Sequence, residues 1–144
     1  MSLPVREQII RNLATRVGAS RRLEMYDERD LPITVLQEGD DQAAETGYDM
    51  TQVSMSISVA RAIPMTGVKS DRWYTELNTA LAKLITELYT GGDDIGGLAQ
   101  GMDYVSGSVD LVTDGGVGAG VAVTVNVRYA FVRGNPYSQD PLAE

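Results

Sequence analysis

Apolar residues recur at helical spacing in two segments of the chain. In residues 3–17 the apolar positions are Val5, Ile9, Ile10, Leu13 and Val17. In the second segment they are Trp73, Leu77, Leu81, Leu84, Ile85 and Leu88. Spacings of three and four residues put each set on one side of a helix. Pro4 and Gly18 frame the first helix, whereas Ser70-Asp71 and Gly91-Gly92 frame the second, as helix ends require.

Four other segments are predicted to be strands, and the alternation of apolar and polar residues that is typical of a strand with one buried face is strict in the second of them. They are residues 31–38, 51–62, 103–113 and 121–132. We expect the first strand to end at Gly39-Asp40-Asp41, and the third to place Val105, Val109 and Leu111 on one face. The last segment is the clearest, because every second residue from Val121 to Phe131 is a large apolar one.

The predicted order of elements is therefore α-β-β-α-β-β. Because each strand has one apolar face, we expect an α+β fold: a two-layer sandwich with a largely antiparallel sheet and two helices on one face. Residues 1–133 are predicted to form a single domain, since a chain of 144 residues suits one core. Residues 134–144 contain Pro136 and Pro141 and show no periodicity, so we predict an extended C-terminal arm.

The composition argues against an enzyme. The chain has no cysteine and no histidine, which removes thiolate nucleophiles, Cys/His zinc sites and the side chain that normally titrates near neutrality. We therefore predict no catalytic residues, no cofactor and no metal. The N-terminus carries charges every few residues in place of an apolar signal segment, and no run approaches the roughly 18 apolar residues of a membrane span. No membrane partner is expected.

Two sequence features resemble binding motifs only in part. The run 115–120 is rich in glycine, but it leads into a strand and lacks the Gly-Lys-Ser/Thr ending of a phosphate loop, so we interpret it as a hairpin turn. The acids between Glu38 and Asp49 do not have the spacing of a calcium loop. A soluble calcium- or ligand-binding module nevertheless stays as an alternative function.

Charge is unevenly distributed along the chain, whose net charge is −8. Residues 1–29 hold six arginines and four acids, whereas residues 30–60 hold six acids and residues 91–114 hold five, with no base in either segment. This balance disfavours tight nucleic-acid binding, which needs clustered bases. It allows the arginines of the first helix, Arg6, Arg11 and Arg16, to meet acidic loops of a neighbouring subunit.

Several segments together resemble the tail terminator proteins of long-tailed bacteriophages. They are the opening helix from Val5 to Ala14, the strand Leu31-Pro32-Ile33-Thr34-Val35, the central helix from Leu77 to Leu84, the glycine-rich approach to Met102-Asp103-Tyr104-Val105, and the closing Val127-Arg128-Tyr129-Ala130-Phe131. The resemblance implies a structural virion protein of the tail or neck, assembled in the host cytoplasm. It implies a hexameric ring that caps the tail tube, ends its polymerisation and offers a surface for head-tail joining.

The same resemblance suggests partners, and the arm and the acidic segments suggest contact residues. The partners would be further copies of this chain, the tail tube protein, a sheath protein where one is present, and head-completion or neck proteins. Tyr137 and Leu142 would anchor the C-terminal arm on a neighbour. Asp40, Asp41, Asp93 and Asp94 would line a lumen through which DNA passes without specific binding, since like charges repel. Another neck component, such as a head-completion or connector subunit, is the alternative within the same class.

Overall fold

The computed structural model describes residues 2–21, 31–65, 67–111 and 118–140. Its elements are α1 (Val5–Val17), β1 (Ile33–Thr46), β2 (Met50–Pro64), the short 3₁₀ helix η2 (Ser70–Arg72), α2 (Trp73–Tyr89), β3 (Gly101–Leu111) and β4 (Gly118–Val132). The main elements occur in the order predicted from the sequence. The expectation of an α+β fold is confirmed.

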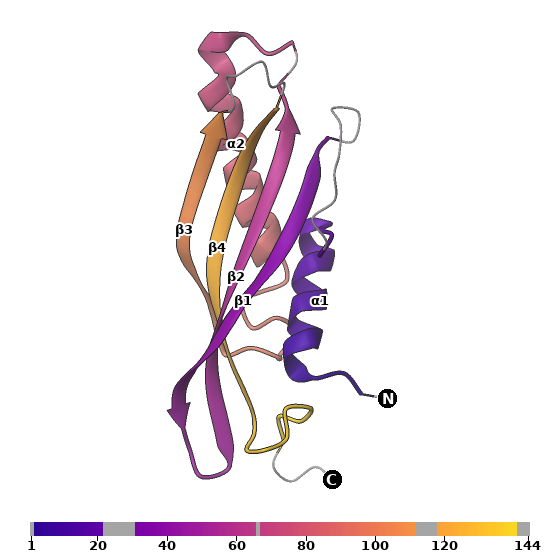
Figure 1. Ribbon diagram of the computed structural model, residues 1–144, viewed down its shortest axis with the longest axis vertical. Coiled ribbons are helices and arrows are strands. Elements are labelled where there is room, and N and C mark those ends of the chain that lie inside the picture. The colour runs from indigo at the N-terminus through magenta and orange to yellow at the C-terminus, as the bar shows by residue number, and fades with distance from the viewer. Residues whose placement is uncertain (1, 22–30, 66, 112–117, 141–144) are drawn as a thin grey trace.

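The four strands form one antiparallel sheet in the order β1-β2-β4-β3 (Figure 1). The two central strands pair along their full length, from Met50 opposite Val132 to Pro64 opposite Gly118. β1 and β3 form the two edges, and α1 lies on the β1 side of the molecule. Two strands far apart in sequence therefore make the middle of the sheet.

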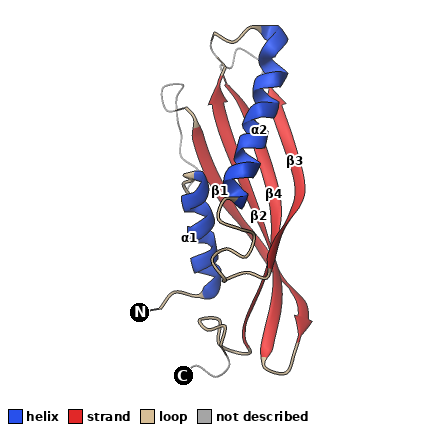
Figure 2. Cartoon of the chain, turned by 180° about the vertical axis from the view of Figure 1, so that it is seen from behind, coloured by secondary structure: helices blue, strands red, loops and turns tan. Residues whose placement is uncertain are grey.

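Both helices cover the same face of the sheet (Figure 2). The core lies between the two layers and takes the alternating residues of the central strands, such as Met55 and Ile57 of β2 and Val123 and Val125 of β4, all of which are fully buried. The buried side of α1 is the apolar stripe expected from the sequence, and α2 buries Leu77, Leu84 and Leu88. The intervening residues of the strands form a polar open face.

The first strand is longer than predicted, because a β-bulge carries it past the expected stop. Pairing with β2 shifts between Glu38 and Asp41 and then continues to Thr46. Gly39 fits here because a Cβ at this position would lie 2.6 Å from the carbonyl oxygen of Ser56. A glycine-acid run that resembles a loop in the sequence thus forms part of a long β1–β2 hairpin.

The third strand also contains a bulge, and this changes one predicted position. Pairing with β4 shifts between Tyr104 and Ser106, so Val105 leaves the alternation and is 52% exposed. Val109 and Leu111 lie opposite Val121 and Ala119 and are partly buried, as expected. The prediction that Val105 shares their buried face is wrong, because an extra residue in a bulge reverses the register.

The C-terminal segment differs from the predicted extended arm. Residues 134–140 turn back onto their own subunit, where Val5 donates a backbone hydrogen bond to the Pro136 carbonyl (2.9 Å) and Val132 donates one to the Ser138 carbonyl (2.7 Å). The Gln139 amide donates to the carbonyls of Leu98 (2.6 Å) and Ala130 (3.0 Å). Proline lacks a donor but keeps its acceptor, so Pro136 can still join such a network. Residues 141–144, which include Leu142, lie outside the described part.

Candidate interaction surfaces

Arg6 connects helix α1 to the bulge of β1. Its guanidinium donates to the Asp41 carboxylate and to the Gly39 carbonyl (2.7 Å), and it lies 3.6 Å from a carboxylate oxygen of Glu38. Because Asp41 pairs with the buried Met55, its side chain is on the helix face of the sheet. The bulge thus brings Asp41 to Arg6.

The same carboxylate receives a hydrogen bond from the buried Tyr129 of β4, whose hydroxyl donates to Asp41 Oδ2 (2.8 Å). Burial, followed by the interaction with Asp41, raises the pKa of the Tyr129 phenol far above its usual value. Three elements, α1, β1 and β4, are therefore joined at one carboxylate. This network ties the bulge of β1, where the hairpin leaves the core, to α1 and β4.

A second acidic side chain, Glu7, holds two arginines at the outer side of α1. Arg21 Nη1 lies 2.6 Å and Arg11 Nε 2.7 Å from Glu7 Oε2, and Arg21 also pairs with Glu38. Hydrogen bonding, first from Arg21 and then from Arg11, lowers the pKa of Glu7 below its usual value. The basic residues near α1 are thus largely balanced by acids of their own chain.

Arg16 has a different role from the other arginines of α1. Its guanidinium donates to the carbonyls of Leu88 (2.9 Å) and Gly92 (2.8 Å), and to the side-chain oxygen of Asn12 (3.0 Å). Carbonyls at a helix C-terminus have no intrahelical partner, so a basic donor there stabilises the helix end. Arg16 therefore ties α1 to the end of α2.

These contacts bear on the predicted subunit interface. Arg6 and Arg16 bind groups of their own subunit, whereas Arg11 is 61% exposed beyond its ion pair with Glu7. Tyr137 is exposed at the surface, and Leu142 lies outside the described residues. Of the proposed interface residues, Arg11 and Tyr137 therefore present the most accessible side chains. Contact with a neighbouring subunit stays a prediction.

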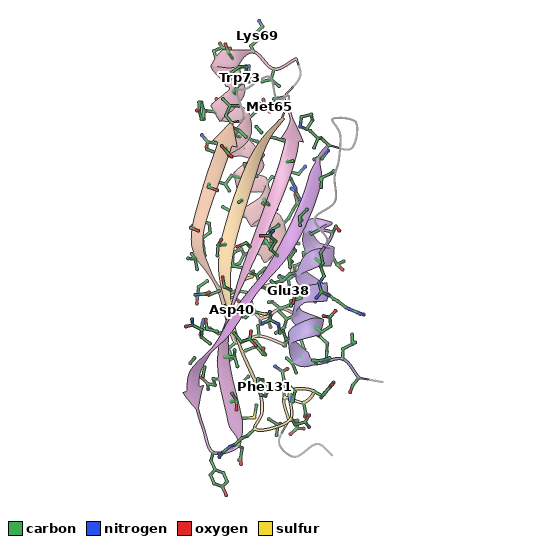
Figure 3. All side chains as sticks on the ribbon, viewed as in Figure 1. Glu38, Asp40, Met65, Lys69, Trp73 and Phe131 are labelled. Atoms are coloured by element: carbon green, nitrogen blue, oxygen red, sulfur yellow. The ribbon has the colours of Figure 1, made fainter. Side chains whose placement is uncertain are left out.

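The four proposed lumen residues do not form one group. Asp40 borders a polar hollow on the open face with Ser54, Ser56 and Asn126, whereas Asp41 is on the helix face. Figure 3 shows Glu38 and Asp40 on opposite sides of β1. Asp93 and Asp94 are exposed in the turns after α2. Whether these residues face a lumen depends on the ring.

The described residues hold no group of three or more acidic side chains that could bind a metal ion. The Asp40 carboxylate is on the open face of the sheet, whereas the Asp41 carboxylate is on the helix face. Asp41 already accepts hydrogen bonds from Arg6 and Tyr129. This geometry gives the calcium-binding alternative no support. In the described part of the chain, no helix is long and apolar enough to span a membrane.

A partly buried ion pair between Arg61 and Glu87 was not anticipated from the sequence. Arg61 donates through Nη1 and Nη2 to the two carboxylate oxygens of Glu87, both at 3.0 Å, through Nε to Thr34 Oγ1 (2.7 Å), and through Nη2 to the Val17 carbonyl (2.9 Å). The bidentate contact with Arg61 lowers the pKa of Glu87 below its usual value. The sequence did contain one indication of this ion pair. Arg61 is the next residue in the alternating series of buried positions of β2, after Val53, Met55, Ile57 and Val59.

An open cleft of about 520 Å³ lies over this ion pair. Its walls come from the end of α1, the outer ends of β1 and β2, and one side of α2, and they include Pro32, Ile63 and Lys83. Acidic and basic side chains are mixed in its lining. The Arg61 nitrogens that face the cleft already donate to Glu87. Arg61 therefore does not offer the cleft an unpaired charge for a ligand.

Among the residues that the structure describes, the large apolar side chains with the greatest exposure are those of Tyr48, Tyr74, Tyr104, Val105 and Tyr137. Tyr48 is 89% exposed in the turn that joins β1 to β2. Figure 1 shows that this hairpin extends well beyond the N-terminal end of α1. Tyr104 and Val105 form a second site of exposure, on the edge strand β3.

Comparison with protein-family models and with curated proteins gives no match for this chain.

Proposed function

We propose that this chain is a structural virion protein that forms a ring on the end of the tail tube of a long-tailed phage. The ring, hexameric by the family resemblance, would end tube polymerisation and offer a surface for head-tail joining. In this proposal the subunit assembles in the host cytoplasm and remains in the tail or neck of the virion. DNA passes through the ring without specific binding.

The observation that carries the proposal is the braced, projecting β1–β2 hairpin. Its acidic segment leaves the core at the Arg6–Asp41–Tyr129 network and ends in a turn with a highly exposed tyrosine. Exposed aromatic side chains are common anchors in protein interfaces, because they bury a large area at a low cost in conformational entropy. A braced projection of this kind suits insertion between copies or onto an underlying ring.

The arrangement of surfaces also suits a closed ring. α1, with the exposed Arg11, is on the β1 side of the sheet, and the acidic strand β3 is at the opposite edge (Figure 1). Complementary surfaces on opposite sides of a subunit produce head-to-tail contacts, which close into a ring if the rotation permits. No catalytic group is needed for this role.

The test uses tubes assembled from the tube protein encoded in the same genome. Purified protein added to these tubes is expected to form one additional ring at the tube end, visible by electron microscopy, and to stop further growth. Tyr48→Ser should weaken this binding, whereas the matched variant Tyr74→Ser, at an exposed tyrosine in the first turn of α2, should not.

Binding of the wild-type protein to portal complexes in place of tubes would assign it to the head-completion or connector proteins. A protein that stays monomeric at all concentrations, and that adds no ring to either structure, would exclude both roles.

A further inference from the structure

The outer edge of β3 is the most accessible strand edge in the described part of the protein. β3 pairs with β4 on one side and is the last strand of the sheet. An edge strand presents backbone donors and acceptors that another extended chain can use. Of the outward groups of β3, the Met102 carbonyl already accepts a hydrogen bond from the Tyr89 hydroxyl (2.9 Å).

The opposite edge of the sheet is less suited to accept a strand. Ser20 bridges to Val35 on the outer side of β1, where its amide donates to the Thr34 carbonyl (3.0 Å) and its carbonyl accepts from Leu36 (2.8 Å). Two shifts in register interrupt the remainder of β1. The two edges of one sheet are therefore unequal.

The side chains of β3 give its edge a distinct chemistry on each face. Asp103 and Asp110 lie opposite Asn126 and Gly120, on the open face of the sheet. Tyr104 lies opposite Val125 on the helix face and is 49% exposed. Its hydroxyl end lies over Gly107, close to Leu81 of α2. One face at this edge is acidic and the other is apolar.

The acidic character excludes one obvious occupant of the edge. A β1 strand from a second copy would bring Asp40, which is on the open face, beside a strand that already carries Asp103 and Asp110 on that face. Like charges on neighbouring strands are destabilising. Arg128, which pairs with Asp103 (3.0 Å), belongs to the same subunit, and its guanidinium lies over Gly101 of β3.

We propose that the β3 edge binds an extended segment of a partner protein in which basic and apolar residues alternate. The segment pairs with β3 as an additional strand. Its basic side chains lie on the open face near Asp103 and Asp110, and its apolar side chains contact Tyr104 and Leu81 on the helix face. This site is present in the isolated subunit. In the ring proposed above the same edge would face α1 of a neighbouring copy, so the segment and the neighbouring copy would compete for it.

The test measures amide shifts and amide hydrogen exchange of the full isotope-labelled chain by nuclear magnetic resonance. The probe is a short blocked peptide in which lysine and valine alternate. Binding is expected to shift residues 101–111 and to slow exchange at alternate β3 amides. A control peptide methylated at alternate backbone nitrogens should not bind, because it cannot complete the hydrogen-bond ladder.

Two variants test the charge requirement. Asp110→Asn should weaken peptide binding by about two- to fivefold, the range of an exposed ion pair, whereas Asp49→Asn, at the hairpin turn, should leave it unchanged. Circular dichroism establishes that both variants keep the fold. A Tyr104→Ser variant tests the apolar face and should also weaken binding.

Three results would overturn the proposal. The first is peptide shifts scattered over all acidic surfaces, or equal binding of the methylated peptide, because either shows nonspecific attraction. The second is no binding at millimolar peptide. The third is concentration-dependent protection of β3 without peptide, which identifies a second copy as the occupant. Capping of tail tubes is measured in a separate experiment. A failure of the peptide to bind β3 therefore does not decide the proposed ring function.

Discussion

At the scale of single residues, buried polar side chains connect the elements that the apolar core separates. Arg61 reaches from β2 to α2, to β1 and to the end of α1, and all of its contacts are made in a mostly buried environment. A buried charge is stable only when it is paired and hydrogen bonded, since desolvation is costly. The stability of the two-layer arrangement should therefore depend strongly on this residue.

Arg61→Ala is expected to lower the free energy of unfolding by roughly 2–4 kcal/mol, because it leaves Glu87 and the Val17 carbonyl without their partner. Urea denaturation followed by circular dichroism measures the change. The control is Arg128→Ala, which removes an ion pair with Asp103 that is about half exposed and should cost no more than about 1 kcal/mol. Equal effects of the two variants would contradict this role of Arg61.

Acid should destabilise the protein partly through Glu87. Its pKa is lower in the folded state than the ordinary 4.5, so its contribution is present above 4.5 and is lost as the pH falls through the lowered value. Glu87→Gln should therefore be less stable than wild type at neutral pH, and the difference should shrink under acidic conditions. Thermal unfolding across this pH range measures it, and a difference independent of pH would argue against the ion pair.

At the scale of elements, the length of the β1–β2 hairpin depends on one close approach between backbones. Gly39 passes so near the Ser56 carbonyl that any side chain would have to displace the strand. The bulge here also turns Asp41 toward Arg6 and Tyr129. One glycine thus permits both the strand pairing and the network that braces the hairpin.

Gly39→Ala should lower the free energy of unfolding by roughly 1–3 kcal/mol, as overpacking usually does. The matched control is Gly47→Ala in the hairpin turn, where the added Cβ would meet its nearest atom, the Met50 carbonyl oxygen, at an ordinary 3.6 Å. The Gly39 variant should also release the amides of residues 41–46 to faster hydrogen exchange. A Gly39 variant as stable as wild type would show that β1 can shift without cost.

The C-terminal segment offers another prediction at this scale. Deletion of residues 134–144 removes the acceptors for Val5 and Val132 and the two side-chain bonds of Gln139. At about 0.5–1.5 kcal/mol for each hydrogen bond, the loss should be at least roughly 2 kcal/mol. Thermal unfolding of the truncated chain measures it. Unchanged stability would restore the view of this segment as an independent arm.

At the scale of the whole molecule, the net charge is −8, and arginines such as Arg6, Arg21 and Arg61 are already engaged in ion pairs within the subunit. Subunits of equal charge repel one another, so a ring must overcome this repulsion through local complementarity. Arg11, at the exposed side of α1, is the best placed of the α1 arginines to supply it.

Self-association is therefore expected to depend on Arg11. Arg11→Glu should weaken ring formation in sedimentation experiments, whereas Lys69→Glu, a charge reversal of the same size beside η2, should have little effect. High salt should also weaken association if such pairs dominate, because the Debye length falls from ~10 Å at 0.1 M to ~3 Å at 1 M. Association that is indifferent to both changes would favour an apolar interface.

The sequence by itself determined the type and order of the main helices and strands and, apart from the bulge at Val105, the apolar side of those for which it predicted one. Val5, Ile9, Ile10, Leu13 and Val17 are buried as their helical spacing predicts, and the alternation from Val121 to Tyr129 is buried as a strand face. These patterns are local, since a helix or strand repeats its side-chain direction every few residues. Burial of one side therefore follows from the spacing alone.

Only the tertiary structure decided where charged residues and irregular backbone meet. Whether Gly39-Asp40-Asp41 ends a strand or bulges within it depends on the register against β2, which no local pattern specifies. Arg16 and Arg61 find their partners across long sequence separations, at the end of α2 and on its inner side. The turn-back of residues 134–140 likewise depends on the Val5 amide at the start of α1 and on the Leu98 and Ala130 carbonyls. Pairings of this kind are set by the packing of distant segments, because an ion pair or hydrogen bond requires proximity in space. The partners of such a contact do not recur at a regular spacing in the sequence, so no periodic pattern predicts them.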